Sequence, residues 1–334
     1  MGKKHNPRPW DFLDNYRGKF FQGEWPSLPE MFDITVERWG SRKCFEAFSP
    51  KHILFTYTEA KAQIEKVSAW LYAQGIRKGD RVAVTGKNSP EWALAYMGVL
   101  YMGAIIVPVD YSLTDEEIEH LVDFVEIKGL FVDGERYERI GKDNKYGFKV
   151  SLEEKGHEEQ YILNLPDVGP QPTQKPVAND LAAFLFTSGT TGTPKAVMLT
   201  HKNFVADCYS AQAWMNIYET DVFYAILPIH HAYTMLAVFI EAMSVGADIV
   251  FGKRLVVSQI FKEMREGGVT MFLAVPMLYN KLISSMMKGV KEKGPFVNGL
   301  IHAMMGFSGF FKKVFKINIG KKMFGFLLKK VSLD

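Results

Sequence analysis

Apolar positions recur at spacings of three and four along residues 59–74, which predicts an amphipathic helix that ends at Gly75. Short apolar runs bounded by turn residues follow this segment and predict buried strands. Ser89 and Thr114 each open a helix-start pattern, in which a proline or several acidic residues come directly after the capping residue. The predicted strands of this half cover residues 81–85, 104–109 and 129–133.

The alternation stops over residues 134–180, which are charged and rich in turn formers. We interpret these residues as a peripheral excursion followed by a linker. The first 55 residues show no clear period and predict an irregular segment. From residue 181 the pattern predicts strands at 181–187, 196–200, 222–227, 248–251 and 269–274, and helices at 202–215, 233–245, 257–266 and 276–287.

Strands that alternate with helices indicate mostly parallel sheets covered by helices on both faces. The chain is therefore predicted to be an α/β protein with two αβα subdomains. The predicted segments are an irregular N-terminal segment at 1–55, a first α/β subdomain with its excursion and linker at 56–178, a second α/β subdomain at 179–287, and a basic aromatic helical insertion at 288–334.

The last of these segments combines ten lysines and seven phenylalanines with only two acidic residues, Glu292 and Asp334. One interpretation is a helix that contacts a membrane surface peripherally through residues 295–331. The other is a basic helical pair that packs on the parent domain. The sequence leaves both open.

Composition excludes several classes of protein. The 334 residues are 47% hydrophobic and 23% charged, which is typical of a globular chain and not of a disordered, collagen-like or disulfide-stapled one. The net charge of +3 is small, and no basic-aromatic pattern fits a nucleic-acid-binding module, so we expect no nucleic-acid partner. Cys44 and Cys208 fit no metal-binding spacing, and reduced thiols in a cytoplasmic protein are the expectation.

The residues after the strand at 181–187 carry the most specific chemistry. Thr187-Ser-Gly-Thr-Thr-Gly-Thr-Pro-Lys195 combines glycines, hydroxyl side chains and one lysine within nine positions. Glycines let the backbone approach a ligand closely, successive amides form a nest for anions, and the lysine adds a positive charge. This composition suits a polyphosphate. A Walker A loop is excluded, because Pro194 interrupts the required spacing and a strand rather than a helix follows. A generic loop of this composition would more often be a hairpin turn without a ligand.

The nine-residue string resembles the signature loop of the adenylate-forming superfamily, which includes acyl-CoA synthetases, luciferases and peptide-synthetase adenylation domains. Ala196 stands where the family usually has glycine. The resemblance implies an ATP-phosphate site and a Mg²⁺ ion held near Thr190. The implied phosphate-binding residues are Thr187, Ser188, Gly189, Thr190, Thr191, Gly192 and Lys195.

A second segment, Leu227-Pro-Ile-His-His-Ala-Tyr233, resembles the family's L-P-x-x-H motif. By this match His231 lines the site of the substrate carboxylate and the α-phosphate, and it joins Lys195 as a candidate catalytic residue. His230, His231 and Tyr233 are the implied substrate-binding residues. Further similar segments at 79–84, 88–92 and 103–110 are interpreted as scaffold, with no chemistry assigned.

The resemblance implies a reaction in two halves. A carboxylate attacks the α-phosphorus of ATP to give an acyl-adenylate and pyrophosphate, and coenzyme A then displaces AMP to give a thioester. A loose match of residues 316–331 to the basic insertion of long-chain fatty acyl-CoA synthetases favours a long-chain fatty acid.

Family motifs for adenine, ribose and magnesium, and the lysine of the small C-terminal domain, have no counterpart in the chain. We therefore expect it to correspond to a truncated first half of such an enzyme, inactive by itself. Alternatives are a ligase of aryl or short acids or one with a carrier-protein acceptor, a non-catalytic nucleotide- or membrane-binding fragment, and a lipid-surface adaptor. The sequence leaves the oligomeric state open.

Overall fold

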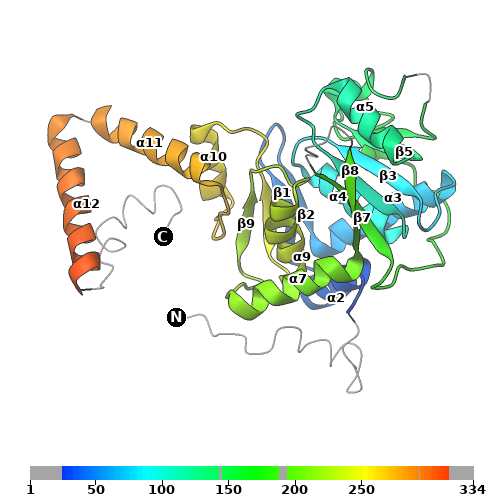
Figure 1. Cartoon of the computed structure of the whole chain (residues 1–334), viewed down its shortest axis with the longest axis horizontal. Helices are drawn as coiled ribbons and strands as arrows, with labels where there is room; N and C mark the ends of the chain where they lie inside the picture. Colours follow the sequence, from blue (N-terminus) through cyan, green and yellow to red (C-terminus); the bar gives the residue numbers. More distant parts are fainter. Residues whose placement is uncertain (1–24, 143–144, 188–193, 293, 316–334) are drawn as a thin grey trace, which may run out of the picture.

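The computed structural model describes residues 25–142, 145–187, 194–292 and 294–315. Two sheets organise these residues, and helices cover their faces (Figure 1). This arrangement confirms the predicted α/β class with mostly parallel strands.

The larger sheet has six strands in the order β6-β5-β3-β4-β7-β8. All neighbours in it are parallel except β7 and β8, which form an antiparallel hairpin. The central strands β3, β4 and β5 are almost wholly buried, as expected of parallel strands covered on both faces. The strands are β3 (Arg81–Thr85), β4 (Ile105–Val109), β5 (Gly129–Val132), β6 (Lys149–Ser151), β7 (Leu181–Thr187) and β8 (Lys195–Thr200).

The smaller sheet has four strands in the order β2-β1-β10-β9, with only β2 antiparallel to its neighbour. It joins two distant parts of the chain, because β1 near the N-terminus pairs with β10. Its strands are β1 (Lys43–Ala47), β2 (Ile53–Thr56), β9 (Val222–Ala225) and β10 (Asp248–Phe251).

Helices fill the space around and between the sheets. They are α2 (Leu28–Trp39), α3 (Tyr57–Ala73), α4 (Pro90–Tyr101), α5 (Asp115–Phe124), α6 (Gly134–Tyr137), the 3₁₀ turn η2 (Ile162–Asn164), α7 (His201–Trp214), α8 (Ala232–Thr234), the π-helical turn η3 (Met235–Ile240), α9 (Glu241–Val245) and α10 (Val257–Glu266). One hydrophobic core runs through both sheets, since Ile106 of the larger sheet and Phe45 of the smaller one belong to the same packed cluster. Between them, Trp92 of α4 packs edge-on against Phe239 of η3 with ring centroids 5.7 Å apart.

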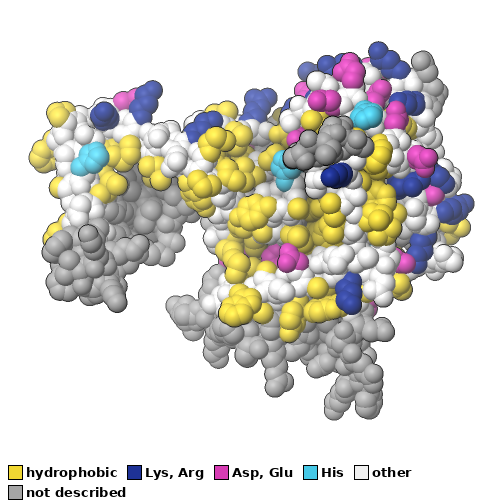
Figure 2. Space-filling model, viewed as in Figure 1, with side chains coloured by type: hydrophobic (Ala, Val, Ile, Leu, Met, Phe, Trp, Pro, Cys, Tyr) yellow, Lys and Arg dark blue, Asp and Glu magenta, His cyan; other side chains and the backbone are white. Residues whose placement is uncertain are grey.

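Two further helices, α11 (Pro276–Glu292) and α12 (Pro295–Phe315), extend away from the two-sheet body (Figure 1). Large apolar side chains of this arm are exposed, among them Met277 and Phe296, and Figure 2 shows hydrophobic surface along it. No helix in the described ranges has the length and apolar content needed to cross a membrane.

The structure corrects several sequence-based expectations. The segment 1–55, expected to be irregular, contains α2, β1 and most of β2 in its described part. The excursion at 134–180 supplies β6, an edge strand of the larger sheet. Residues 269–274 were expected to form a strand, but among them only Met271 bridges to Phe223. The strands β1, β2 and β6 have only three to five residues each, and runs this short carry too little periodicity to reveal them.

The expected boundary near residue 178 does not coincide with a boundary between sheets. Strands β7 and β8 follow it in the sequence, yet they pair with β4 in the larger sheet. The independence of the predicted subdomains 56–178 and 179–287 stays a prediction.

Candidate active site

A cavity of about 800 Å³ opens where strand ends from both sheets meet. Strands β4 and β7 are parallel neighbours, so their carboxyl ends lie at the same edge of the larger sheet. Residues after these two strands line the cavity together with the segment 230–232, which follows β9 of the smaller sheet. The carboxyl edge of an open α/β sheet is the usual position of a ligand site in such folds.

The β7–β8 hairpin borders this cavity. Thr187 ends β7, Lys195 begins β8, and the two residues are paired opposite each other in the antiparallel ladder. Thr187 and Pro194 line the cavity, and both Thr187 and Lys195 are exposed. The hairpin thus brings Thr187, one end of the predicted phosphate loop, into the cavity wall, while Lys195 at the other end pairs with Thr187 but is not among the lining residues. The other predicted phosphate-binding residues, Ser188, Gly189, Thr190, Thr191 and Gly192, lie outside the described residues.

The segment that carries the histidines is fixed by one side chain from the neighbouring sheet. The Asn88 amide donates to the carbonyls of Ala225 (2.9 Å) and Leu227 (2.8 Å) and accepts from the Ile229 amide (3.1 Å). Asn88 is buried and follows β3, so it connects the two sheets directly beside His230. Local sequence signals give no hint of this role, because all three partners belong to another segment of the chain.

His230 lies against Asp110, which follows β4. The Nε2 atom of His230 is 3.4 Å from Oδ1 of Asp110, and the Tyr111 ring forms a T-shaped pair with the imidazole at a centroid distance of 5.9 Å. Burial lowers the pKa of His230 to about 4, and the neighbouring His231 adds to the effect. The His230 imidazole is therefore neutral at pH 7.

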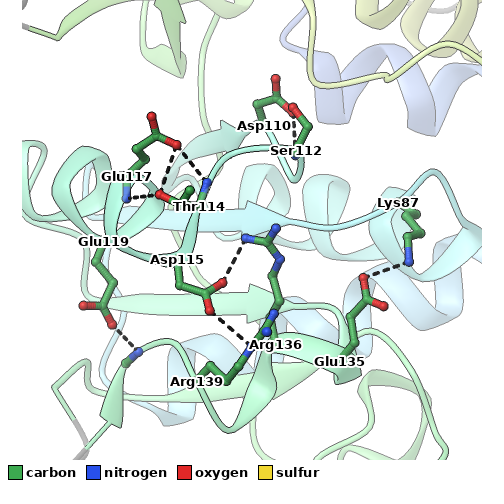
Figure 3. Close-up of polar contacts among 11 residues, drawn as sticks. Lys87, Asp110, Ser112, Thr114, Asp115, Glu117, Glu119, Glu135, Arg136 and Arg139 are labelled. Atoms are coloured by element: carbon green, nitrogen blue, oxygen red, sulfur yellow. Dashed lines mark hydrogen bonds and ion pairs between the residues drawn. The ribbon is translucent and has the colours of Figure 1, made fainter.

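Asp110 accepts a hydrogen bond from the Ser112 amide (2.8 Å) in the turn that leads to α5, as Figure 3 shows. Partial burial raises the pKa of the Asp110 carboxyl, but the bonds from Ser112 and the two nearby histidines outweigh it and hold the pKa below its ordinary value. The cavity thus offers a carboxylate beside a neutral imidazole. Sequence reasoning assigned Asp110 to the scaffold, although an acidic residue directly after a buried parallel strand is a signal for a site at the carboxyl edge.

The other two predicted substrate-binding residues have different surroundings. His231 is exposed and lines the cavity, and its ring lies 4.2 Å from that of His230, centroid to centroid. Its carbonyl accepts hydrogen bonds from the Thr234 hydroxyl (3.2 Å) and the Met235 amide (2.8 Å), which anchor it at the start of α8. Tyr233 is 54% exposed and is not among the residues that line the cavity.

The rest of the cavity wall is mainly apolar. Side chains of β7, β8, α5 and the turn before α5 contribute most of it: Leu113, Leu121, Leu185, Phe186, Val197 and Leu199. Two polar residues of α5, Glu117 and His120, interrupt this wall. Glu117 closes the capping box of α5 by accepting from the Thr114 amide (2.8 Å; Figure 3). The cavity therefore combines a polar end, formed by the histidines and Asp110, with a surface suited to an apolar group.

The described residues do not fit a magnesium site. Thr190, the predicted Mg²⁺ ligand, lies outside them. Asp110, His230 and His231 are the described group of metal-binding side chains at the cavity, and this group offers two nitrogens and one carboxylate. Mg²⁺ strongly prefers oxygen ligands in an octahedral arrangement. No step is therefore assigned to Mg²⁺ at these three residues.

Comparison with known proteins places this geometry in a family. A model of the AMP-binding enzyme family matches residues 32–310, most of the chain. A medium/long-chain-fatty-acid–CoA ligase of Mycobacterium tuberculosis is 26% identical over 252 residues, which cover 75% of this chain and 42% of the relative. 4-Coumarate:CoA ligase 1 of Petunia hybrida is 29% identical over 255 residues, which cover 72% of this chain and 46% of that protein.

The fold agrees with these matches. The inhibitor-bound N-terminal domain of FACL13 from Mycobacterium tuberculosis superimposes with a TM-score of 0.68 at 21% identity, covering 77% of this chain and 65% of that domain. The chain spans about half the length of the curated relatives it matches. With the family model matching across both sheets and the cavity between them, the chain belongs to the AMP-binding family of adenylate-forming enzymes.

Proposed function

We propose that this chain provides the ATP-phosphate and carboxylate sites of an acid–thiol ligase. In the first half-reaction a carboxylate oxygen bonds to the α-phosphorus of ATP, and the bond from this phosphorus to the pyrophosphate breaks. In the second, a thiol such as that of coenzyme A bonds to the acyl carbon, and AMP leaves while the thiol proton passes to solvent. ATP, the acid and the thiol are substrates in this scheme.

One observation carries the proposal: the hairpin ends Thr187 and Pro194 and the histidine His231 line the same cavity. A phosphate held by the hairpin would therefore lie close to a carboxylate held at His231. Bringing two anionic reactants together requires positive and hydrogen-bonding groups that fix them in line. Lys195 supplies a positive charge at the hairpin, and His231 supplies an imidazole at the edge of the cavity.

His231 is the proposed orienting group for the carboxylate, and Lys195 the proposed partner of the phosphates. Ser188, Gly189, Thr190, Thr191 and Gly192 complete the phosphate site in this proposal. His230 supports His231 through the contact between their rings. Tyr233, two residues after His231, is also proposed to bind the substrate.

The proposed substrate class is a fatty acid, and more specifically a long-chain fatty acid. The apolar wall formed by α5 and the β7–β8 hairpin supports an apolar acyl group, and a fatty-acid–CoA ligase is among the similar proteins. The second candidate is an aryl acid, favoured by the similarity to 4-coumarate:CoA ligase 1. Coenzyme A is the proposed acceptor, and a carrier protein is the alternative.

The test measures ATP binding to the chain by isothermal titration calorimetry, because binding requires no complete turnover. We expect Lys195→Ala to weaken ATP binding about tenfold, which corresponds to about 1.4 kcal/mol. Lys202→Ala is the matched control, since Lys202 is an exposed lysine in the first turn of α7 and is not among the cavity residues. Unchanged affinity in Lys195→Ala, or equal losses in both variants, would refute the phosphate assignment.

The carboxylate assignment has its own measurement. Binding of a non-reactive acyl-adenylate analogue carrying a C16 chain is compared between the native chain and His231→Ala, with ATP affinity measured in parallel. We expect the analogue to lose affinity while ATP affinity stays within about twofold, because His231 is the proposed contact of the carboxylate and not of the β- and γ-phosphates. A native affinity for the analogue in His231→Ala would overturn this role. A coumaroyl-adenylate analogue that binds more tightly than the C16 analogue would favour the aryl acid.

A further inference from the structure

The side chains of Asp110, His230 and His231 are close enough to share one metal ion. Each offers a ligand atom, and the three atoms lie within 4.8 Å of one another. The separation of 3.4 Å between Asp110 Oδ1 and His230 Nε2 is close to the spacing of about 3.3 Å between two ligands of a tetrahedral ion with bonds of about 2.0–2.1 Å. The cluster therefore has nearly the dimensions of a metal site.

A buried nitrogen in this cluster lacks a partner. The Nε2 atom of His230 is buried and has no hydrogen-bond partner among the described residues, although Oδ1 of Asp110 lies 3.4 Å away. His230 as a whole is only 8% exposed. A buried polar atom without a partner costs free energy, so its presence in a folded site calls for an additional ligand. A metal ion would use the lone pair of this nitrogen.

The backbone around the cluster is already held in place. Asn88 fixes residues 225–229 directly before His230, and the Ser112 amide holds the Asp110 carboxylate. Such outer contacts orient the ligands of metal sites and raise their affinity. The three residues come from two sheets, so the site forms only in the folded chain.

The donor set selects the type of ion. Two imidazoles and one carboxylate are the ligands that Zn²⁺ and related divalent transition metals prefer, whereas Mg²⁺ and Ca²⁺ prefer oxygen alone. With three protein ligands, a tetrahedral ion keeps one position for water or for an added ligand. All three residues line the cavity, so this open position is accessible from it.

We propose that Asp110, His230 and His231 form a binding site for a divalent transition-metal ion of the Zn²⁺ type, with an open coordination position toward the cavity. On the basis of the proposed function, a bound ion would occupy His231 and compete with its contact to the substrate carboxylate. The metal site itself does not depend on that function, since it is measured without ATP and without an acid.

The experiment uses the full chain, free of an affinity tag and treated with a chelator, and titrates it with Co²⁺ as a spectroscopic probe for Zn²⁺. We expect the intense visible absorption of a tetrahedral Co²⁺ ion, which Zn²⁺ abolishes by displacement and Mg²⁺ leaves unchanged. Competition with a coloured chelator then gives the Zn²⁺ affinity. This readout does not depend on catalytic activity.

Variants identify the ligands. Loss of an outer contact of a metal ligand already costs about 10–100-fold in affinity, so removing a direct ligand in His231→Gln or Asp110→Asn should cost at least about a hundredfold and abolish the tetrahedral spectrum. His120→Ala is the matched control, because this exposed histidine lines the same cavity outside the cluster. Since His231 is exposed, His231→Gln should keep the native circular dichroism. The ligand assignment can therefore be tested with this variant even if a variant of the buried His230 fails to fold.

Absence of a tetrahedral spectrum in the native chain would overturn the proposal. So would a spectrum that survives both His231→Gln and Asp110→Asn, because the metal would then be held by other residues. A loss of ATP binding in Lys195→Ala together with an intact Co²⁺ spectrum would separate the metal site from the phosphate site.

Discussion

At the scale of single residues, several acidic side chains are buried more deeply than an ionised carboxylate tolerates. Glu241, the first residue of α9, is only 2% exposed, and burial raises its pKa to about 8. The pKa of Asp248 in β10 is likewise raised to about 7 by burial and by nearby Glu46. Both carboxyl groups therefore hold a proton in the folded state at a pH where the unfolded chain has released it.

This burial predicts the direction in which stability changes with pH. Between the ordinary pKa of 4.5 and about 8, the folded state binds more protons at Glu241 than the unfolded state does. The contribution of Glu241 to the free energy of unfolding is therefore fully present below about pH 4.5 and is lost as pH rises toward 8. Glu241→Gln should remove this loss. The free energy of unfolding of the variant, relative to that of the native chain, should therefore be higher at pH 8 than at pH 5 by at least about 1 kcal/mol.

Urea denaturation of both proteins at the two pH values measures this difference. The exposed Glu266→Gln at the end of α10 serves as the control and should show the same pH dependence as the native chain. An equal effect of Glu241→Gln at pH 5 and pH 8 would mean that Glu241 is ionised in the folded state.

At the scale of elements, the segment between β9 and α8 depends on a contact from outside its own sheet. The three hydrogen bonds of Asn88 supply partners for two carbonyls and one amide of this segment. The Thr234 hydroxyl also donates to the Pro228 carbonyl at the start of α8. The position of His230 and His231 is therefore set by β3 and α4 as much as by β9.

Asn88→Ala should consequently destabilise this segment. We expect a loss of about 2–3 kcal/mol in the free energy of unfolding, because three backbone groups, two of them in buried hydrogen bonds, lose their partner together. Hydrogen exchange at the Ile229 amide should accelerate, since this amide donates to Asn88. Asn164→Ala is the control, because its amide makes one exposed bond to the Glu158 carbonyl and should cost less than about 1 kcal/mol. Unaltered exchange at Ile229 in Asn88→Ala would show that the segment is held in another way.

The elements also show which signals local sequence carries. The capping box Thr114–Glu117 and the spacing of apolar residues over 257–266 predict α5 and α10 well, because each depends on residues within one or two turns. The pairing of β1 with β10 and the contact of Asp110 with His230 depend on tertiary packing between distant segments, so no local pattern reveals them. Of the predicted site residues, Thr187, His230 and His231 line one cavity, whereas Lys195 and Tyr233 are not among its lining residues.

At the scale of the whole molecule, the shared core makes the two sheets one packed unit. Trp92 of α4 lies at the centre of this core, stacked on Tyr96 and edge-on to Phe239 of η3. The arm of α11 and α12 contrasts with this body, since many of its apolar side chains are exposed. Peripheral membrane contact through residues 295–331 stays a prediction.

The shared core predicts a single cooperative unfolding transition. Circular dichroism and tryptophan fluorescence should report the same melting temperature, and Trp92→Ala should lower the free energy of unfolding by about 3–5 kcal/mol without splitting the transition. Trp214→Ala is the matched control, since Trp214 is 91% exposed and its loss should be nearly neutral. Two separate transitions would instead support independent subdomains at 56–178 and 179–287.

The dependence of the histidine segment on Asn88 has a consequence for the chemical ageing of the protein. Asparagine side chains deamidate slowly in solution, and deamidation of Asn88 would replace its NH₂ group by a carboxylate oxygen. This oxygen would face the carbonyl oxygens of Ala225 and Leu227. Two attractive hydrogen bonds would thus be replaced by repulsion between oxygens. A sample stored for long periods would then lose its histidine geometry in a subpopulation with almost unchanged mass but one added negative charge, which isoelectric focusing resolves.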